Sequence, residues 1–251
     1  MRGRELAWAV VMSLGVCGGA GVVHAHMRDY LINQDYYTAK HGEFEVEFYN
    51  DMNFTDAGHD DTYNSKHQVE LEYGVFDHFQ LAYYEVYTWD RAKSWARDEF
   101  KLEGKLRFAE AGRWPVDVAL YAEYANPDGH RDAHSDTVEG KLILSKDVGL
   151  WNVVTNLIAE KAVNKAAGWE VAYTAGLSYG LTPRTRVGLE WKETLGDTNE
   201  FGWRRADHVI QLVPGIYTNL ADHLRLLAGV AFGLTKASDD IALKSIVKWE
   251  F

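Results

Sequence analysis

Residues 169–179, WEVAYTAGLSY, alternate position by position between two kinds of side chain. The odd-numbered positions carry Trp, Val, Tyr, Ala, Leu and Tyr, and the even-numbered positions carry Glu, Ala, Thr, Gly and Ser. Successive side chains of a β-strand point to opposite faces, so this segment has one apolar face and one polar or small-residue face. The stretch predicts a strand that separates an apolar environment from an aqueous one.

The same period of two returns along most of the chain. About twelve segments show it, at residues 43–54, 66–75, 79–88, 99–108, 115–125, 137–145, 150–161, 169–179, 185–194, 207–218, 224–235 and 241–251. The connections between them alternate between longer acidic stretches, such as residues 126–132, and short turn sequences, such as Thr182-Pro183. This alternation is typical of an all-β, up-and-down antiparallel transmembrane β-barrel with short periplasmic turns and longer acidic outer loops.

A soluble barrel or a β-sandwich is the alternative fold, because its strands alternate as well. In such a protein the apolar face points inward, and the lengths of the loops need not alternate. The regular change from long to short connections therefore favours the membrane barrel.

The N-terminal residues 1–25 predict a secretory signal peptide. Arg2 and Arg4 precede an apolar run that ends near Val23-His24-Ala25, a plausible cleavage sequence. A single membrane anchor and a lipoprotein modified at Cys17 are weaker alternatives. We expect residues 26–42 to form a periplasmic N-terminal segment and residues 43–251 to form the barrel, exported to the cell outer membrane.

Composition excludes several classes of function. The net charge of −11 gives no basic stripe for a nucleic-acid backbone, so no nucleic-acid partner is expected. The single cysteine, Cys17, lies inside the predicted signal peptide, which leaves no disulfide framework and no thiolate cofactor site. We expect no cofactor.

The charged faces of the strands must point into the barrel, because a Lys or Arg at the middle of the membrane costs about 2–4 kcal/mol. The predicted lumen-lining residues are Glu43, Glu45, Glu47, Glu70, Glu72, Lys101, Glu103, Lys105, Arg107, Asp117, Tyr121, Glu123, Glu139, Lys141, Arg186, Glu190, Lys192, Lys244 and Lys248.

Two pairings of charge follow from the strand order. Closure of the barrel brings Lys244 and Lys248 beside the row from Glu43 to Glu47. The fourth strand places Lys101, Lys105 and Arg107 beside Asp117 and Glu123 of the fifth. Such a lumen suits a narrow porin-like passive channel for ions or small solutes. Six glycines would keep parts of the wall thin or, equally well, allow the strands to bend and the barrel to curve: Gly104, Gly140, Gly176, Gly188, Gly229 and Gly233. A filled, non-conducting structural or surface-interaction barrel is the alternative, because twelve strands lie between the filled eight-stranded and the open sixteen-stranded barrels.

Neither a metal site nor a catalytic site is predicted. His130 and His134 lie among aspartates, and His59 precedes two more, but nothing organises them and a solvated acidic loop explains them better. The sequence His134-Ser135-Asp136 is the nearest approach to a hydrolase site, and its neighbouring side chains point in different directions. We therefore expect a protein that is not an enzyme.

The C-terminal strand ends with Trp249 and Phe251, and a terminal aromatic residue resembles the assembly signal of bacterial outer-membrane proteins. The expected partners are thus the lipid bilayer, lipopolysaccharide and the outer-membrane assembly machinery.

Three strand–turn–strand pieces carry a resemblance to a known group. Residues 72–81 (EYGVFDHFQL), 179–187 (YGLTPRTRV) and 217–226 (YTNLADHLRL) resemble proteobacterial outer-membrane proteins of the phenol-degradation transporter-like group. The resemblance implies an outer-membrane barrel that passes a small solute.

Overall fold

The structure is a computed structural model that describes residues 30–56, 63–89, 94–128, 135–163, 168–200 and 208–251. The predicted signal peptide (residues 1–25), Cys17 and the loop histidines His59, His130 and His134 lie outside the described residues. No helix in the described ranges is long and apolar enough to cross a membrane.

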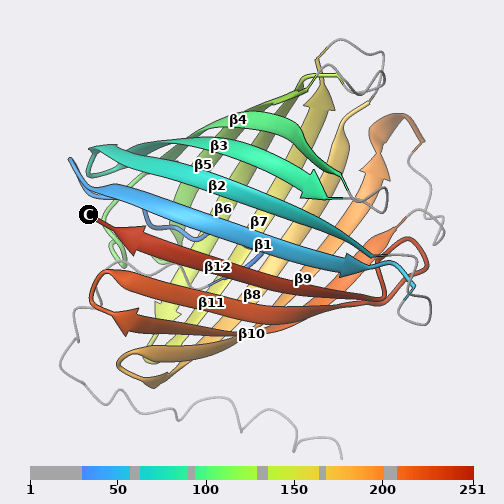
Figure 1. The fold of residues 1–251 in the computed structure, drawn as a ribbon. Helices are drawn as coiled ribbons and strands as arrows, with labels where there is room; N and C mark the ends of the chain where they lie inside the picture. Colours follow the sequence, from blue (N-terminus) through green and yellow to red (C-terminus); the bar gives the residue numbers. More distant parts are fainter. Residues whose placement is uncertain (1–29, 57–62, 90–93, 129–134, 164–167, 201–207) are drawn as a thin grey trace, which may run out of the picture.

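The described chain forms one closed, antiparallel barrel of twelve strands, each paired with its neighbours in sequence (Figure 1). The strands are β1 (Phe44–Phe54), β2 (Tyr63–Phe76), β3 (Phe79–Trp89), β4 (Trp95–Arg107), β5 (Asp117–Pro127), β6 (Thr137–Val148), β7 (Trp151–Ala162), β8 (Glu170–Thr182), β9 (Thr185–Asp197), β10 (Val209–Ala221), β11 (Leu224–Gly233) and β12 (Ile241–Glu250). A short 3-10 helix, η2 (Thr198–Glu200), follows β9. The up-and-down barrel predicted from the sequence is confirmed.

Closure occurs between β1 and β12, where Val46 lies opposite Trp249 and Phe48 opposite Val247. The barrel therefore has no free edge, and the strands satisfy their backbone groups through one another. The end that carries the turns at residues 77–78, 149–150, 183–184 and 222–223 is called the turn end here, and the opposite end is the loop end. The chain terminates at the turn end (Figure 1).

One connection differs from the expected alternation. The link between β4 and β5, residues 108–116, lies at the turn end but is longer than the other turns there. Its residues make contacts that a tight turn does not reach: the Ala109 carbonyl accepts a hydrogen bond from the Tyr36 hydroxyl. This link thus covers part of the turn end.

The two faces of the wall have opposite character. Outward-pointing residues such as Phe48, Leu102 and Leu157 remain 47–50% exposed, although they are large and apolar. Between them along the strands, charged residues such as Glu47, Glu103 and Glu190 are buried inside. An apolar exterior around a polar interior is the arrangement that a lipid-facing barrel requires.

Part of the N-terminal segment lies inside the barrel. Residues 26–42 were expected as a separate periplasmic stretch, but residues 30–39 are almost all buried and bind the inner wall. The segment returns to the turn end at Gly42, whose amide donates to the Gly74 carbonyl (2.8 Å). We call residues 30–39 the lumen segment. The expectation placed residues 26–42 outside the barrel because they show no strand periodicity, and this periodicity carries no information about what fills the interior.

Candidate functional site

The strongest attachment of the lumen segment is a buried carboxylate on β9. Glu190 accepts hydrogen bonds from the backbone amides of Leu31 (2.7 Å), Ile32 (2.9 Å) and Asn33 (3.0 Å). It also accepts from the Asn33 side-chain amide and from the Tyr217 hydroxyl, each at 2.9 Å. Successive backbone N–H groups that converge in this way form a nest for an anion. Here the anion belongs to the wall of the barrel.

Amide side chains hold the rest of the segment. Asn156 accepts from the Gln34 amide (2.7 Å) and donates to the Gln34 carbonyl (2.9 Å), as a neighbouring strand would. Gln80 accepts from the Ala39 amide at 2.9 Å, and the Tyr30 hydroxyl donates to the Asn152 side chain at 2.6 Å. Because the bonds of Asn156 and Gln80 satisfy backbone groups of a segment without regular structure, they allow it to be buried.

Glycines on the inner wall provide space for the segment. A Cβ atom at Gly176 would lie 2.5 Å from the ring of Tyr30, and one at Gly229 would lie 2.5 Å from the side chain of Leu31. Both distances are shorter than any normal contact, so these positions accept only glycine while the segment is in place. The glycines were expected to keep the channel open; at these two positions the lumen segment occupies the space instead.

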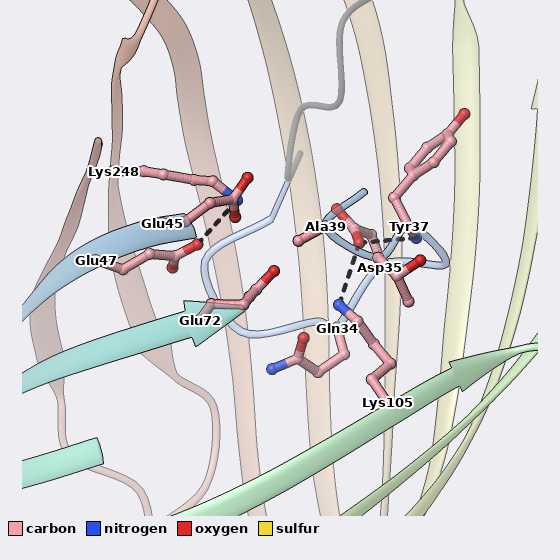
Figure 2. A pocket seen from close by; sticks show the side chains of 10 residues that line it. Gln34, Asp35, Tyr37, Ala39, Glu45, Glu47, Glu72, Lys105 and Lys248 are labelled. Carbon is pink, nitrogen blue, oxygen red and sulfur yellow. Dashed lines mark hydrogen bonds and ion pairs between the residues drawn. The ribbon is translucent and has the colours of Figure 1, made fainter. Parts of the chain in front are cut away.

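A cluster of charges lies between the segment and the wall at the turn end (Figure 2). Glu45 and Glu47 of β1 and Glu72 of β2 have carboxylate oxygens within 4.8 Å of one another. Lys248 of β12 forms ion pairs with Glu45 and with Glu47, the latter at 3.3 Å. This ammonium compensates part of the buried negative charge of the three carboxylates, so the protein itself supplies a cation for this group.

A second cavity, of about 220 Å³, lies on the other side of the segment, toward the loop end. Leu31 and Ile32 line it on the segment side, and the strands contribute apolar side chains such as Ile158 and Ile246. Its charged lining residues are Asp51, Glu139, Lys141, Lys192 and Lys244. This cavity is therefore part apolar and part cationic.

The predicted lumen residues separate into two groups by exposure. The buried ones on the inner side of the wall are Glu45, Glu47, Glu70, Glu72, Glu103, Lys105, Arg107, Asp117, Tyr121, Glu190 and Lys248. The half-buried ones are Glu43, Lys101, Glu123, Glu139, Lys141, Arg186, Lys192 and Lys244.

Several of these residues form hydrogen bonds with groups at the turn end and do not face the open part of the lumen. Glu43 accepts from the Lys40 amide (2.8 Å), and Asp117 accepts from the Gly112 amide (2.8 Å). Arg107 donates to the Asp77 carbonyl, and Arg186 to the Ser178 hydroxyl. These contacts fix turns and strand ends.

The predicted pairings of charge are found in part. Lys248 contacts Glu45 and Glu47, and Lys101 contacts Glu123 at 3.0 Å. Lys244 instead pairs with Asp51 at 2.7 Å, because strand register places them opposite each other. Lys105 turns toward Asp35 of the lumen segment, 3.8 Å away (Figure 2).

Sequence reasoning missed the lumen segment and the residues that hold it. Residues 30–39, YLINQDYYTA, carry one charge, three tyrosines and two amide side chains, a composition unlike that of a solvated linker. That composition was the available signal that residues 30–39 are buried. Nothing local pointed to Asn152, Asn156 or Gln80 as its partners.

Comparisons with known proteins give a fold likeness. No protein-family model matches the chain, and no curated protein sequence matches it. An outer-membrane channel from Pseudomonas putida F1 superposes with a TM-score of 0.64 at 12% identity, covering 87% of this chain and 99% of that one. The KdgM porin, solved in complex with disordered oligogalacturonate, superposes with a TM-score of 0.59 at 8% identity, covering 82% and 99%. At these identities the likeness establishes a shared barrel fold.

Proposed function

We propose that this protein is an outer-membrane barrel that acts as a narrow, porin-like passive channel for ions or small solutes. The observation that carries the proposal is the cavity of about 220 Å³ beside the lumen segment, in a barrel with an apolar exterior and a charged interior. Barrels with a polar interior conduct when water fills a continuous path. The lumen segment narrows that path at the turn end.

The similar solved structures include an outer-membrane channel and a porin, which supports a channel over another role for the same fold. The transporter-like group suggested by residues 72–81, 179–187 and 217–226 is compatible with it. The proposal also includes export by a signal peptide at residues 1–25, recognition of Trp249 and Phe251 during assembly, and contact with lipopolysaccharide. It assigns no catalytic residue and no cofactor.

The filled, non-conducting barrel is the second candidate, and the burial of the lumen segment favours it. Tyr30 and Tyr36 are at most 1% exposed, and Leu31 is 7% exposed, so they pack inside the barrel as core residues do. If no path bypasses them, the same fold would act through its surface.

Planar-bilayer recording separates the two candidates. We expect the refolded protein to show small, discrete current steps. A variant with residues 30–39 replaced by Gly and Ser should show severalfold larger steps, because the obstruction is gone. Heat-dependent gel migration would first show that both proteins are folded. Silence of the intact protein together with current in the variant would favour the filled barrel, and silence of both would reject the channel.

A further inference from the structure

The cavity beside the lumen segment contains a lysine that forms no direct ion pair within the described part of the chain. Lys141 pairs with Glu139 at 2.8 Å, and Lys244 pairs with Asp51 at 2.7 Å. Lys192 lines the same cavity and has no carboxylate within 4.0 Å among the residues that the structure describes. The charged lining thus consists of two ion pairs and one additional ammonium group.

A buried hydroxyl next to this lysine also lacks a partner. Thr174 is 2% exposed, and its Oγ1 makes no hydrogen bond within the described part of the chain. It lies directly opposite Lys192 in the pairing of β8 with β9, and it lines the same cavity. Side chains directly opposite on paired strands are about 4.5–5.5 Å apart at Cβ. A buried polar group without a partner costs free energy. The Thr174 hydroxyl and the Lys192 ammonium can therefore form favourable hydrogen bonds with a ligand in the cavity.

The rest of the lining limits the chemistry of that ligand. Leu31, Ile158 and Ile246 offer apolar surface around the cations. An ammonium group and a hydroxyl together suit the two oxygens of a carboxylate. Because one of the three lining ammonium groups has no direct carboxylate partner in the lining, a single negative charge matches the site. A cavity of about 220 Å³ admits only a compact molecule.

From these observations we infer that the cavity binds a small organic monocarboxylate, with the carboxylate on Lys192 and Thr174 and the apolar body against Leu31, Ile158 and Ile246. The inference rests on the proposed function, since it names the solute class that would occupy the lumen. Lys141 and Lys244 are not the direct ligands, because each is already paired with a carboxylate of the lining.

Isothermal titration of the refolded protein in detergent tests the site with benzoate as the probe. Benzyl alcohol is the matched neutral compound, and inorganic phosphate is the matched anion without an apolar body. We expect saturable binding of benzoate and much weaker binding of the other two. Lys192→Gln should weaken benzoate binding about tenfold, the size of one charge-assisted hydrogen bond. Thr174→Val should weaken it less.

Lys161→Gln is the control, because it removes the same charge from a lysine that lies over the Trp169 ring, outside the cavity. It should bind benzoate as the unchanged protein does. Equal binding by Lys192→Gln and the control would overturn the inference. Equal binding of benzoate and benzyl alcohol, or tighter binding of phosphate, would also overturn it.

Titration does not depend on conduction, so the two proposals fail separately. Current steps without saturable benzoate binding would reject the carboxylate site and retain the channel. Benzoate binding that Lys192→Gln weakens, in a protein without current, would support the site and reject the channel.

Discussion

At the scale of single residues, Glu190 is the main attachment point that holds the lumen segment against the wall. Its carboxylate is fully buried and accepts four hydrogen bonds from residues 31–33 and one from Tyr217. A hydrogen bond to a charged group contributes about 1.5–3 kcal/mol, roughly twice the value for a neutral pair. Because one side chain binds three consecutive amides, a single substitution disturbs the whole attachment.

We predict that Glu190→Gln releases the segment. The glutamine NH₂ group is itself a donor, so it cannot accept from the N–H groups of the segment, and the negative charge is lost. The docking of the lumen segment on the wall should therefore weaken by about 3 kcal/mol, roughly a hundredfold. A reporter cysteine, Leu31→Cys in a Cys17→Ser background, should then react much faster with a water-soluble thiol reagent. Glu193→Gln is the matched control on the same strand, since Glu193 binds Tyr173 rather than the segment. Similar labelling rates in the two variants would contradict the role of Glu190.

At the scale of elements, the seam between β1 and β12 closes the barrel, and a buried ion-pair cluster lies on it. Lys248 is the cation for Glu45 and Glu47, each of which is 1% exposed. A buried pair adds little net stability, because desolvation offsets the attraction between the charges. Removal of one partner lowers the stability by much more than the intact pair raises it, because it leaves a buried charge without compensation.

Lys248→Met should therefore lower the free energy of unfolding by about 3–5 kcal/mol. Adding Glu45→Gln and Glu47→Gln to the same chain should restore much of that loss, because the uncompensated charges are removed. Arg184→Met is the control: its pair with Asp222 (3.3 Å) is mostly exposed and should contribute under about 1 kcal/mol. Denaturant titrations in detergent measure all three. A Lys248→Met variant no less stable than Arg184→Met would show that the cluster does not support the seam.

At the scale of the whole molecule, the exterior determines the environment of the barrel. Large apolar side chains surround it, with Phe48, Leu102 and Leu157 about half exposed. On a soluble protein so large an apolar surface would drive association. In a bilayer the same surface contacts lipid, and the cost of a charge then depends on its depth.

This depth dependence can be measured with two arginine substitutions. Leu157 lies at the middle of β7, and Val148 lies at the turn end of β6; both are exposed on the wall. In lipid vesicles, Leu157→Arg should cost about 2–4 kcal/mol and Val148→Arg about 0–1 kcal/mol. Denaturant titration of tryptophan fluorescence gives both values. Equal costs at the two positions would argue against a membrane-spanning wall.

The sequence alone determined the wall of this protein. Alternation with a period of two is local, and a slip of one residue would exchange the polar and apolar faces, so the strands and their two faces follow from neighbouring residues. The interior was decided only by the tertiary structure. The Leu31 amide meets Glu190 across a separation of 159 residues. Among the described residues, Lys141 and Lys244 each form an ion pair, whereas Lys192 has no carboxylate within 4.0 Å. Such contacts depend on which inner positions meet inside a closed barrel, which no local pattern encodes.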